Sequence, residues 1–378
     1  MITGFSPSPL FERVERARRR KHKFRDTQIT LAHGSGGRAM HELIEGLFLE
    51  YLRNPLLEKL EDQAVFEIGG SVETTAGSNG HAPTRMAFTT DSYVVDPVFF
   101  PGGDIGRLAV NGTVNDLAMS GARPLYLSAG FILEEGFPIE DLKRILESMR
   151  DAAGEAGVAV VTGDTKVVQK GSADKIFINT SGIGVIETPV RLSAAGAEVG
   201  DKVILSGTIG DHGTTIMIAR GELELETDIE SDTAPLNGLV QEMVEEAGNA
   251  LAFEAVHCLR DPTRGGAATT LNEIASSSEV YIEIDEDLIP VREEAKGACE
   301  ILGLDPLYVA NEGKLIAIVA PEIAEALVNR MKQNRYGRDA CVIGEVKAEP
   351  RGIVAMRTGF GGTRIVDMLV GEQLPRIC

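Results

Sequence analysis

The stretch that decides the fold of the first half of the chain is Ile105-Gly106-Arg107-Leu108-Ala109-Val110-Asn111-Gly112-Thr113-Val114-Asn115-Asp116-Leu117-Ala118. Its residues predict a helix, which follows a Gly102-Gly103 turn. Strands are predicted on either side of it, at 86–90 and 125–132, so the helix belongs to a layer that mixes helices and strands. Asp116 lies near the end of this helix.

The alternation of strands and helices continues outward from this helix. A helix is predicted at 139–156 and strands at 158–161 and 176–186, up to a boundary near Pro189. The second half has predicted strands at 202–205, 314–319 and 341–347, a helix that ends near Ala219, and helices at 236–250, 266–278, 291–302 and 321–334. The sequence thus predicts a two-domain α/β protein of the α+β type. Its parts are a basic extension at 1–28, domains at 29–188 and 189–370, and a tail at 371–378.

The charge of the chain excludes some classes of partner. Its 378 residues carry a formal net charge of −20, with a pI of about 4.8. Nucleic acid is therefore not expected as the main partner, because phosphate backbones are bound by a basic face. Nucleotides remain possible ligands, since backbone N–H groups and bridging metal ions hold their phosphates locally.

The cysteines and the hydropathy of the chain predict a cytoplasmic protein. Four cysteines stand far apart at Cys258, Cys299, Cys341 and Cys378, with no CxxC pair. This spacing suits neither a disulfide framework nor a zinc site, and it fits a reducing compartment. No apolar run reaches the roughly 18 residues that would cross a bilayer, and no signal peptide is evident. We expect no membrane association.

A glycine-rich turn follows the basic extension. Residues 29–32 predict a short strand that leads into Gly34-Ser35-Gly36-Gly37, and an amphipathic helix follows. Such a turn presents free N–H groups to an anion. Gly34 to Ala39 also matches the G-x-G-x-x-A dinucleotide pattern, but no clear second strand follows the helix, and 67–83 predicts a loop. A phosphate-contacting loop and a tight turn without ligand both remain open.

Three acids stand just after or beside apolar segments, namely Asp91, Asp116 and Asp164. Carboxylates at strand ends that a fold gathers together suit Mg²⁺, which takes one or two of them plus nucleotide phosphates. Taken singly, each is equally typical of a cap or a turn. No P-loop or kinase loop is present, yet glycine-rich turns and acids recur.

Three further motifs carry groups that could do chemistry. Lys166 follows Asp164 closely and could contact a phosphate or act as a base. Glu312 lies in a predicted turn before the strand at 314–319. Asp261-Pro262-Thr263-Arg264-Gly265-Gly266 offers an anion nest and a cation before a helix, which suits phosphate or acyl oxygen. Each motif also has a purely structural interpretation.

The chain ends on a free thiol, in Leu374-Pro375-Arg376-Ile377-Cys378. A cysteine nucleophile can be acylated and later discharged, and a terminal one can enter another active site. Seven residues from Glu372 span roughly 23 Å when extended. A swinging carrier is therefore feasible, and an accidental exposed terminus is the alternative.

Several segments occur together in a characteristic order. They are Ala32-His33-Gly34-Ser35-Gly36-Gly37, Asp91-Ser92, Phe99-Phe100-Pro101-Gly102-Gly103-Asp104-Ile105-Gly106, Val114-Asn115-Asp116-Leu117-Ala118, Val161-Thr162-Gly163-Asp164-Thr165-Lys166-Val167-Val168, Ser206-Gly207-Thr208-Ile209-Gly210-Asp211-His212-Gly213, Asp261-Pro262-Thr263-Arg264-Gly265-Gly266, Asn311-Glu312-Gly313-Lys314 and Pro375-Arg376-Ile377-Cys378. As a set, they closely resemble the HypE family of hydrogenase expression/formation proteins. The resemblance covers nearly everything from Ile29 to Cys378.

The resemblance implies a fold and a reaction. The family is similar to aminoimidazole ribonucleotide synthetase and selenophosphate synthetase, which implies two domains with ATP and Mg²⁺ between them and a homodimer joined through the N-terminal sheets. A partner, the carbamoyltransferase HypF, would load a carbamoyl group on the terminal thiol. ATP would then drive its dehydration to a thiocyanate, and the cyanide would pass to iron on the HypC–HypD complex for [NiFe] hydrogenase.

The resemblance also implies roles for individual residues. It assigns Cys378, Lys166 and Glu312 to catalysis, the last two as bases. The implied metal ligands are Asp91, Asp116 and Asp164, with Asp62 as a weaker addition. The implied nucleotide contacts are Gly34, Ser35, Gly36, Gly37, Asp91, Asp116, Asp164, Thr165, Asp261 and Arg264. The basic extension lies outside the resemblance.

Two other functions remain open at this point. A small-molecule synthetase of the same fold would hydrolyse ATP but would not need Cys378. A non-enzymatic carrier would present the thiol to partners and would not hydrolyse ATP. Loss of water at Cys378 distinguishes both from the dehydratase.

Overall fold

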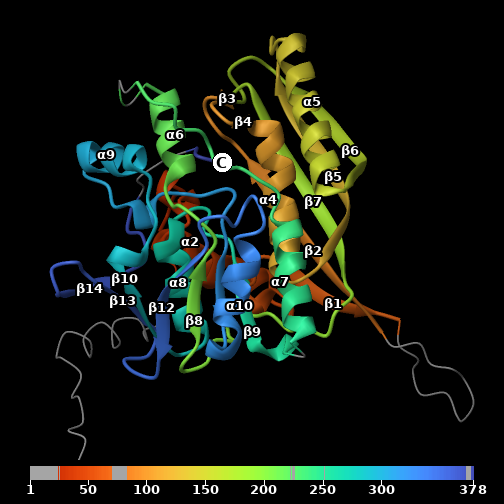
Figure 1. Cartoon of the computed structure of the whole chain (residues 1–378). Coiled ribbons are helices and arrows are strands. Elements are labelled where there is room, and N and C mark those ends of the chain that lie inside the picture. The colour runs from red at the N-terminus through yellow and green to blue at the C-terminus, as the bar shows by residue number, and fades with distance from the viewer. Residues whose placement is uncertain are drawn as a thin grey trace, which may run out of the picture.

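The computed structural model describes residues 24, 26–69, 83–221, 223, 226–250, 252–371 and 376–378. Most of the basic extension, residues 70–82 of the predicted loop and residues 372–375 of the tail lie outside the described part. Figure 1 shows two regions of mixed helices and strands, with the C-terminus between helix α6 and helix α4.

The first region is built on a five-stranded sheet with the order β1-β2-β7-β5-β6. All its neighbours pair antiparallel except β5 and β6, which are parallel. Its strands are β1 (Ala64–Ile68), β2 (Thr84–Tyr93), β5 (Arg123–Glu134), β6 (Ala159–Val168) and β7 (Ile176–Ile186). The short hairpin β3 (Phe99–Phe100) and β4 (Gly103–Asp104) precedes α4.

Helices α4 (Ile105–Met119) and α5 (Ile139–Ala156) cover one face of this sheet, with α4 next to the strands. Asp104 caps α4, because its Oδ1 accepts hydrogen bonds from the N–H groups of Gly106 (2.7 Å) and Arg107 (3.0 Å). Nearly every residue of α4 is buried. The predicted helix is therefore confirmed, and it is the interior element of the first region.

The second region has a seven-stranded sheet with the order β14-β13-β10-β12-β8-β11-β9. Successive residues of its strands point to opposite faces. Ile204 and Ala317 pack in one core with α7 and α10, whereas Val203 and Ile316 pack in another with α8. The strands are β8 (Lys202–Leu205), β9 (Val256–Arg260), β10 (Tyr281–Asp285), β11 (Ile316–Val319), β12 (Cys341–Lys347), β13 (Ile353–Arg357) and β14 (Thr363–Val366).

Its helices complete the second region. They are α6 (Asp211–Ala219), α7 (Asn237–Asn249), α8 (Gly266–Ser277), α9 (Glu293–Leu302) and α10 (Pro321–Met331), with 3₁₀ turns η4 (Phe253–Ala255), η5 (Glu286–Leu288) and η6 (Pro306–Tyr308). These helices and β8, β11 and β12 confirm the predicted elements within a few residues.

The two regions share a core. Leu117 and Met119 of α4 lie in the same buried cluster as Leu236 and Leu239 near α7. Glu155 at the end of α5 also bonds Arg335 and Tyr336 of the second region. The residues between the two sheets therefore have fixed neighbours on both sides.

The prediction was wrong for residues 29–32 and right for the helix that follows them. The strand at 29–32 is absent; its place is taken by extended chain and the 3₁₀ turn η1 (Leu31–Gly34), because Thr30 and His33 bond each other and hold a turn. Helix α2 (Arg38–Leu43), the π-helical turn η2 (Ile44–Phe48) and α3 (Leu49–Leu52) form the predicted amphipathic helix, and η3 (Leu57–Lys59) follows.

The sequence also missed strands. The loop predicted from residue 67 begins inside β1, and β9, β10, β13 and β14 were not anticipated. Asp91 and Asp164 do not follow strands but lie within β2 and β6. Both strands continue through polar residues because their backbone pairing with β7 and β5 does not depend on apolar side chains.

Candidate active site

A cavity of about 450 Å³ lies between the two regions. It collects most of the predicted site residues, although they come from distant parts of the sequence. The predicted residues that line it are Gly36, Asp62, Asp91, Asp116, Asp261, Arg264, Glu312 and Cys378. Gly34, Ser35 and Gly37 stand beside Gly36 but are not part of the lining.

The C-terminal end of the chain lies inside this cavity. The Val94 N–H donates to the Cys378 carbonyl (3.1 Å), and the Asp96 N–H donates to the Arg376 carbonyl (3.2 Å). Ile377, between them, is buried in the core that α4 and α5 make with the first sheet. The last residues thus extend the first region as a short paired segment that delivers the terminal thiol to the cavity.

The Cys378 thiol meets a carboxyl group there. Burial and a hydrogen bond to Glu312 raise the thiol's pKa well above its usual range, which favours the S–H form. The charge of Arg264 acts on the same thiol and lowers its pKa in part. The raised pKa favours the protonated thiol in this position, where Glu312 is a hydrogen-bond partner.

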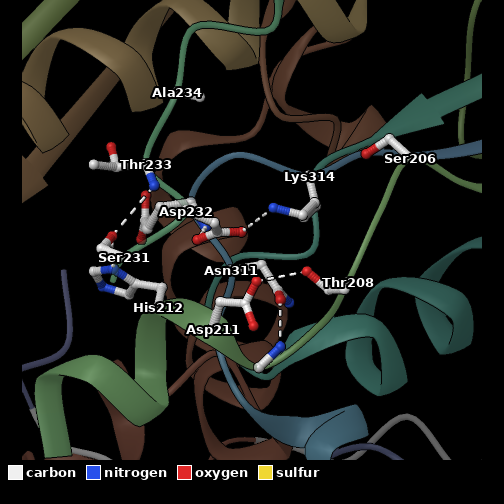
Figure 2. A network of polar contacts seen from close by, with 12 residues as sticks. Ser206, Thr208, Asp211, His212, Ser231, Asp232, Thr233, Ala234, Asn311 and Lys314 are labelled. Atoms are coloured by element: carbon white, nitrogen blue, oxygen red, sulfur yellow. Dashed lines mark hydrogen bonds and ion pairs between the residues drawn. The ribbon is translucent and has the colours of Figure 1, made fainter. Parts of the chain in front are cut away.

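Glu312 is held by its main chain. Its N–H donates to Asp232 Oδ1 (3.0 Å), and Asp232 Oδ2 is paired with Lys314 Nζ at 2.9 Å (Figure 2). A Cβ at Gly313 would lie 1.8 Å from the Asp232 carbonyl oxygen, so only glycine fits there. The Glu312 side chain is 3% exposed, and its Oε1 has no hydrogen-bond partner.

Burial raises the pKa of Glu312 well above the usual carboxyl range, and the charge of Asp232 raises it further. A carboxyl group with a raised pKa is a stronger base than an ordinary one. The unpaired Oε1 leaves an acceptor free for a proton from a neighbouring group.

Two acids line the wall formed by the first region. Thr89 Oγ1 lies 2.7 Å from Asp116 Oδ2, and the Tyr93 hydroxyl donates to Asp91 Oδ2 (3.2 Å). A Cβ at Gly112 would lie 2.1 Å from the Tyr93 oxygen, so this glycine lets α4 approach Tyr93. Burial and the charge of Asp91 raise the pKa of Asp116 well above the usual range.

Arg260 of the second region holds a third acid, Asp62, whose carbonyl oxygen lies 2.9 Å from the same Thr89 Oγ1. Arg260 lies 2.8 Å from Asp62 Oδ1 and 2.7 Å from Glu273 Oε2, and Glu273 also bonds His41. Asp62 Oδ2 is buried without a partner, and burial raises the pKa of Asp62 well above its usual value. The neighbouring Asp261 has a pKa raised to about 6 by burial.

The glycine-rich turn packs against the start of α8. A Cβ at Gly36 would lie 2.5 Å from the Arg264 carbonyl oxygen, so Gly36 permits this contact. The turn and the residues 261–266 therefore form one wall, and this wall precedes a helix N-terminus, where an anion is favoured.

Asp164, Thr165 and Lys166 do not join the cavity. They lie on β6, the edge strand of the first sheet, where Asp164 and Lys166 are 70% and 68% exposed and pair with each other at 2.5 Å. Within one copy of the chain, the structure thus separates these three from the other predicted site residues.

Sequence reasoning missed several residues of the site. Tyr93, Arg260 and Asp232 stand in no motif of the sequence. Only the fold reveals that they are buried beside the acids. His212 does stand in a motif, Asp211-His212-Gly213, but that motif also suited a structural residue. Its partner is the tail itself, since Nε2 lies 2.7 Å from the Ile377 carbonyl oxygen.

The residues of the cavity fit a nucleotide with a divalent cation. Among the described residues, no three His, Cys, Asp or Glu side chains form a complete metal-binding group. Burial and the charges of neighbouring acids nevertheless raise the pKa values of Asp62, Asp116 and Asp261, and Asp62 Oδ2 lacks a partner. Mg²⁺ needs only one or two such carboxylates when phosphates supply other ligands.

Comparison with known proteins defines the class. Residues 61–186 match the family model described as AIR synthase related protein, N-terminal domain, and residues 198–357 match the corresponding C-terminal domain. The fold is thus the two-domain fold of AIR synthase related proteins. Among the described residues, no helix is long and apolar enough to span a membrane.

Individual relatives show which family within this class the chain belongs to. Carbamoyl dehydratase HypE of Azotobacter vinelandii is 54% identical over 94% of this chain and 98% of its own. A structure titled as a HypE–HypF complex has a TM-score of 0.77 at 50% identity, covering 86% of this chain and 99% of that one. HypE in complex with ATP has a TM-score of 0.74 at 50% identity, covering 93% and 100%. The chain belongs to the HypE family.

The raised carboxyl pKa values predict a pH-dependent stability. A carboxyl whose pKa is higher in the folded than in the unfolded state stabilises the fold below about pH 4 and loses this contribution as pH rises through its folded pKa. For Asp261 this loss falls between about pH 4 and 6. We expect Asp261 to lower the thermal stability of the ligand-free protein over this range, so the melting temperature of Asp261→Asn should rise relative to that of the unmodified protein as pH increases from 4 to 6.

Melting temperatures measured from pH 4 to 7 check this. Asp151→Asn, at a surface position that is 63% exposed, is the matched control and should keep the original slope. An unchanged slope in Asp261→Asn would contradict the electrostatic description of the cavity.

Proposed function

We propose that this protein dehydrates a carbamoyl group that is carried as a thiocarbamate on Cys378. The thiocarbamate and ATP give a thiocyanate on Cys378, ADP and phosphate, and the product supplies cyanide for the iron of [NiFe] hydrogenase. The position of the Cys378 thiol against Glu312, inside a cavity lined by acids and by Arg264, carries the proposal. The relatives named carbamoyl dehydratase HypE and the HypE structure with ATP support it.

The proposed reaction needs the amide oxygen to leave. ATP would supply a phosphoryl group to this oxygen, so that it departs as phosphate instead of hydroxide. Mg²⁺, held by Asp62, Asp91 and Asp116 together with the phosphates, would neutralise the developing charge. The start of α8 and the Arg264 side chain would face the anionic groups from the other wall.

Glu312 would take one of the two amide protons. A thiocarbamate on Cys378 extends from the sulfur that now touches Glu312, so its amide nitrogen lies within reach of the unpaired Oε1. The raised pKa of Glu312 places its proton affinity closer to that needed at neutral pH. The backbone bond to Asp232 fixes the direction of approach.

The second proton calls for another base, and Lys166 is the proposed one. Within one chain Lys166 is remote from the cavity, so this role requires a second copy of the protein. The register of the sheet supports this arrangement, because Lys166 pairs with Ile132, and Asp164 with Gly130, on the face away from α4. That outer face also exposes Phe88 (46%), Tyr126 (53%) and Ile132 (43%).

An exposed apolar face of this kind favours association. We infer a homodimer joined through the first sheets of two copies, so that Asp164, Thr165 and Lys166 of each copy approach the cavity of the other. The proposed partners are HypF, which would load the thiol, and the HypC–HypD complex, which would receive the cyanide. The proposed compartment is the cytoplasm, where the unpaired cysteines stay reduced.

Intact-mass spectrometry tests the reaction. Protein that its carbamoyltransferase partner has loaded should lose one water at Cys378 when ATP is added. Glu312→Gln should load normally but lose water at least about 100-fold more slowly, since general-base catalysis contributes about 10² or more. Cys341→Ser is the matched thiol control and should behave as the unmodified protein. Water loss in Cys378→Ala would contradict the assignment.

Mixed dimers test the shared site. Lys166→Ala and Glu312→Gln should each be inactive alone, whereas their mixture should regain activity, because each mixed dimer contains one site with both native residues. The measurement is the rate of water loss after subunit exchange. Full activity of Lys166→Ala alone, or no recovery on mixing, would exclude a base supplied by the second copy.

A further inference from the structure

The last three residues are held by contacts from several elements. Besides the backbone bonds from residues 94 and 96, Arg220 at the end of α6 donates to the Arg376 carbonyl and to the Asp96 carbonyl, each at 2.8 Å. The Arg376 guanidinium in turn pairs with Asp174 and Asp96 at the surface. The tail therefore lies in a built site and not on a passive surface.

The deepest of these contacts comes from a fully buried histidine. His212 lies on α6, with Nε2 2.7 Å from the Ile377 carbonyl oxygen and Nδ1 2.7 Å from Ser231 Oγ. Because a carbonyl oxygen only accepts, Nε2 must carry a hydrogen. Burial lowers the pKa of His212, so the neutral ring is favoured, and its Nδ1 then accepts from the Ser231 hydroxyl.

The same short segment also serves the proposed base. Ser231 accepts a hydrogen bond from the Thr233 N–H at 3.2 Å (Figure 2). Asp232, between them, accepts from the Glu312 N–H. The Ser231 N–H donates to the Pro101 carbonyl, which ties the segment to the first region. Within residues 231–233, Ser231 thus contacts His212, which binds the tail, and Asp232 binds the Glu312 N–H.

We propose that His212, oriented by Ser231, is a positioning residue that latches the C-terminal tail in the cavity. This inference rests on the proposed function, in which the tail leaves to be loaded and returns to be dehydrated. The neutral hydrogen bond from His212 adds to the bonds from residues 94, 96 and 220, and it favours the inner position further without making it permanent. The ion pairs of Arg376 with Asp96 and Asp174 are partly exposed, and we expect them to contribute less than the buried contact.

Alkylation of Cys378 by iodoacetamide, followed by mass spectrometry of the C-terminal peptide, measures how often the tail leaves. His212→Phe removes the donor but keeps a ring, which packs beside Phe100. It should be alkylated about two- to tenfold faster, the range expected for one lost hydrogen bond. His212→Gln, whose amide keeps an N–H donor, should react at nearly the native rate.

The matched control is His257→Gln. His257 also pairs with a buried group, Asp201, but none of its described contacts is with the tail, so the native alkylation rate is expected. Because His212→Phe could also lower stability, melting temperatures accompany each rate, and Ser231→Ala and Arg220→Gln provide independent variants that should accelerate alkylation as well. A native rate in all three, or equal acceleration in His212→Gln and His212→Phe, would overturn the latch.

A second readout connects the latch to the reaction. His212→Phe should accept the carbamoyl group from its partner at the native rate but lose water more slowly, since only the second step uses the inner position. Slower loading with unchanged water loss would overturn the proposal. The alkylation assay needs neither ATP nor a carbamoyl group, so it tests the latch even if the native protein fails to form a thiocyanate.

Discussion

The contact between the Cys378 thiol and the Glu312 carboxyl depends on nearly every part of the fold. The thiol reaches Glu312 because the last residues pair with residues 94–96 and bury Ile377 in the first core. Glu312 is in place because Asp232 binds its N–H and Gly313 admits Asp232 closely. The contact joins the end of the chain, which pairs with the first region, to Glu312 of the second region. A change in how the two regions pack would therefore separate the Cys378 thiol from the Glu312 carboxyl.

The electrostatics of the cavity follow from the same arrangement. Four aspartates and Glu312 face a small space that Arg260 and Arg264 only partly neutralise, and burial together with the charges of neighbouring acids raises the pKa values of Asp62, Asp116, Asp261 and Glu312. Crowded carboxylates are unfavourable in the absence of a cation. The same crowding would favour binding of the divalent cation of a metal–nucleotide complex. The proposed chemistry requires the positive charge of that cation.

The sequence predicted the chemistry better than the geometry. Cys378, Glu312 and Arg264 could be singled out because they stand in terminal or glycine-containing motifs, and Asp116 because it stands beside an apolar segment; the structure brings all four together. His212 and Asp232 could not be assigned roles, because what they do depends on burial and on partners more than 60 residues away in the chain. Local propensity also failed at residues 29–32, where a side-chain bond replaces the expected strand. The segment 164–166 was predicted to follow a strand, but it lies within β6 and away from the cavity of its own chain, which no single sequence reveals.

Disulfide trapping tests the inner position of the tail most directly. In Glu312→Cys, a thiol stands on the residue that faces Cys378 in the inner position, so mild oxidation should join the two thiols once tail motion brings their Cβ atoms within about 4.5 Å. Glu300→Cys, at an exposed position on α9, should not react in this way. Peptide mass spectrometry would identify the bond. Efficient formation in Glu312→Cys alone is the predicted result, and its absence, or equal trapping in Glu300→Cys, would contradict the account.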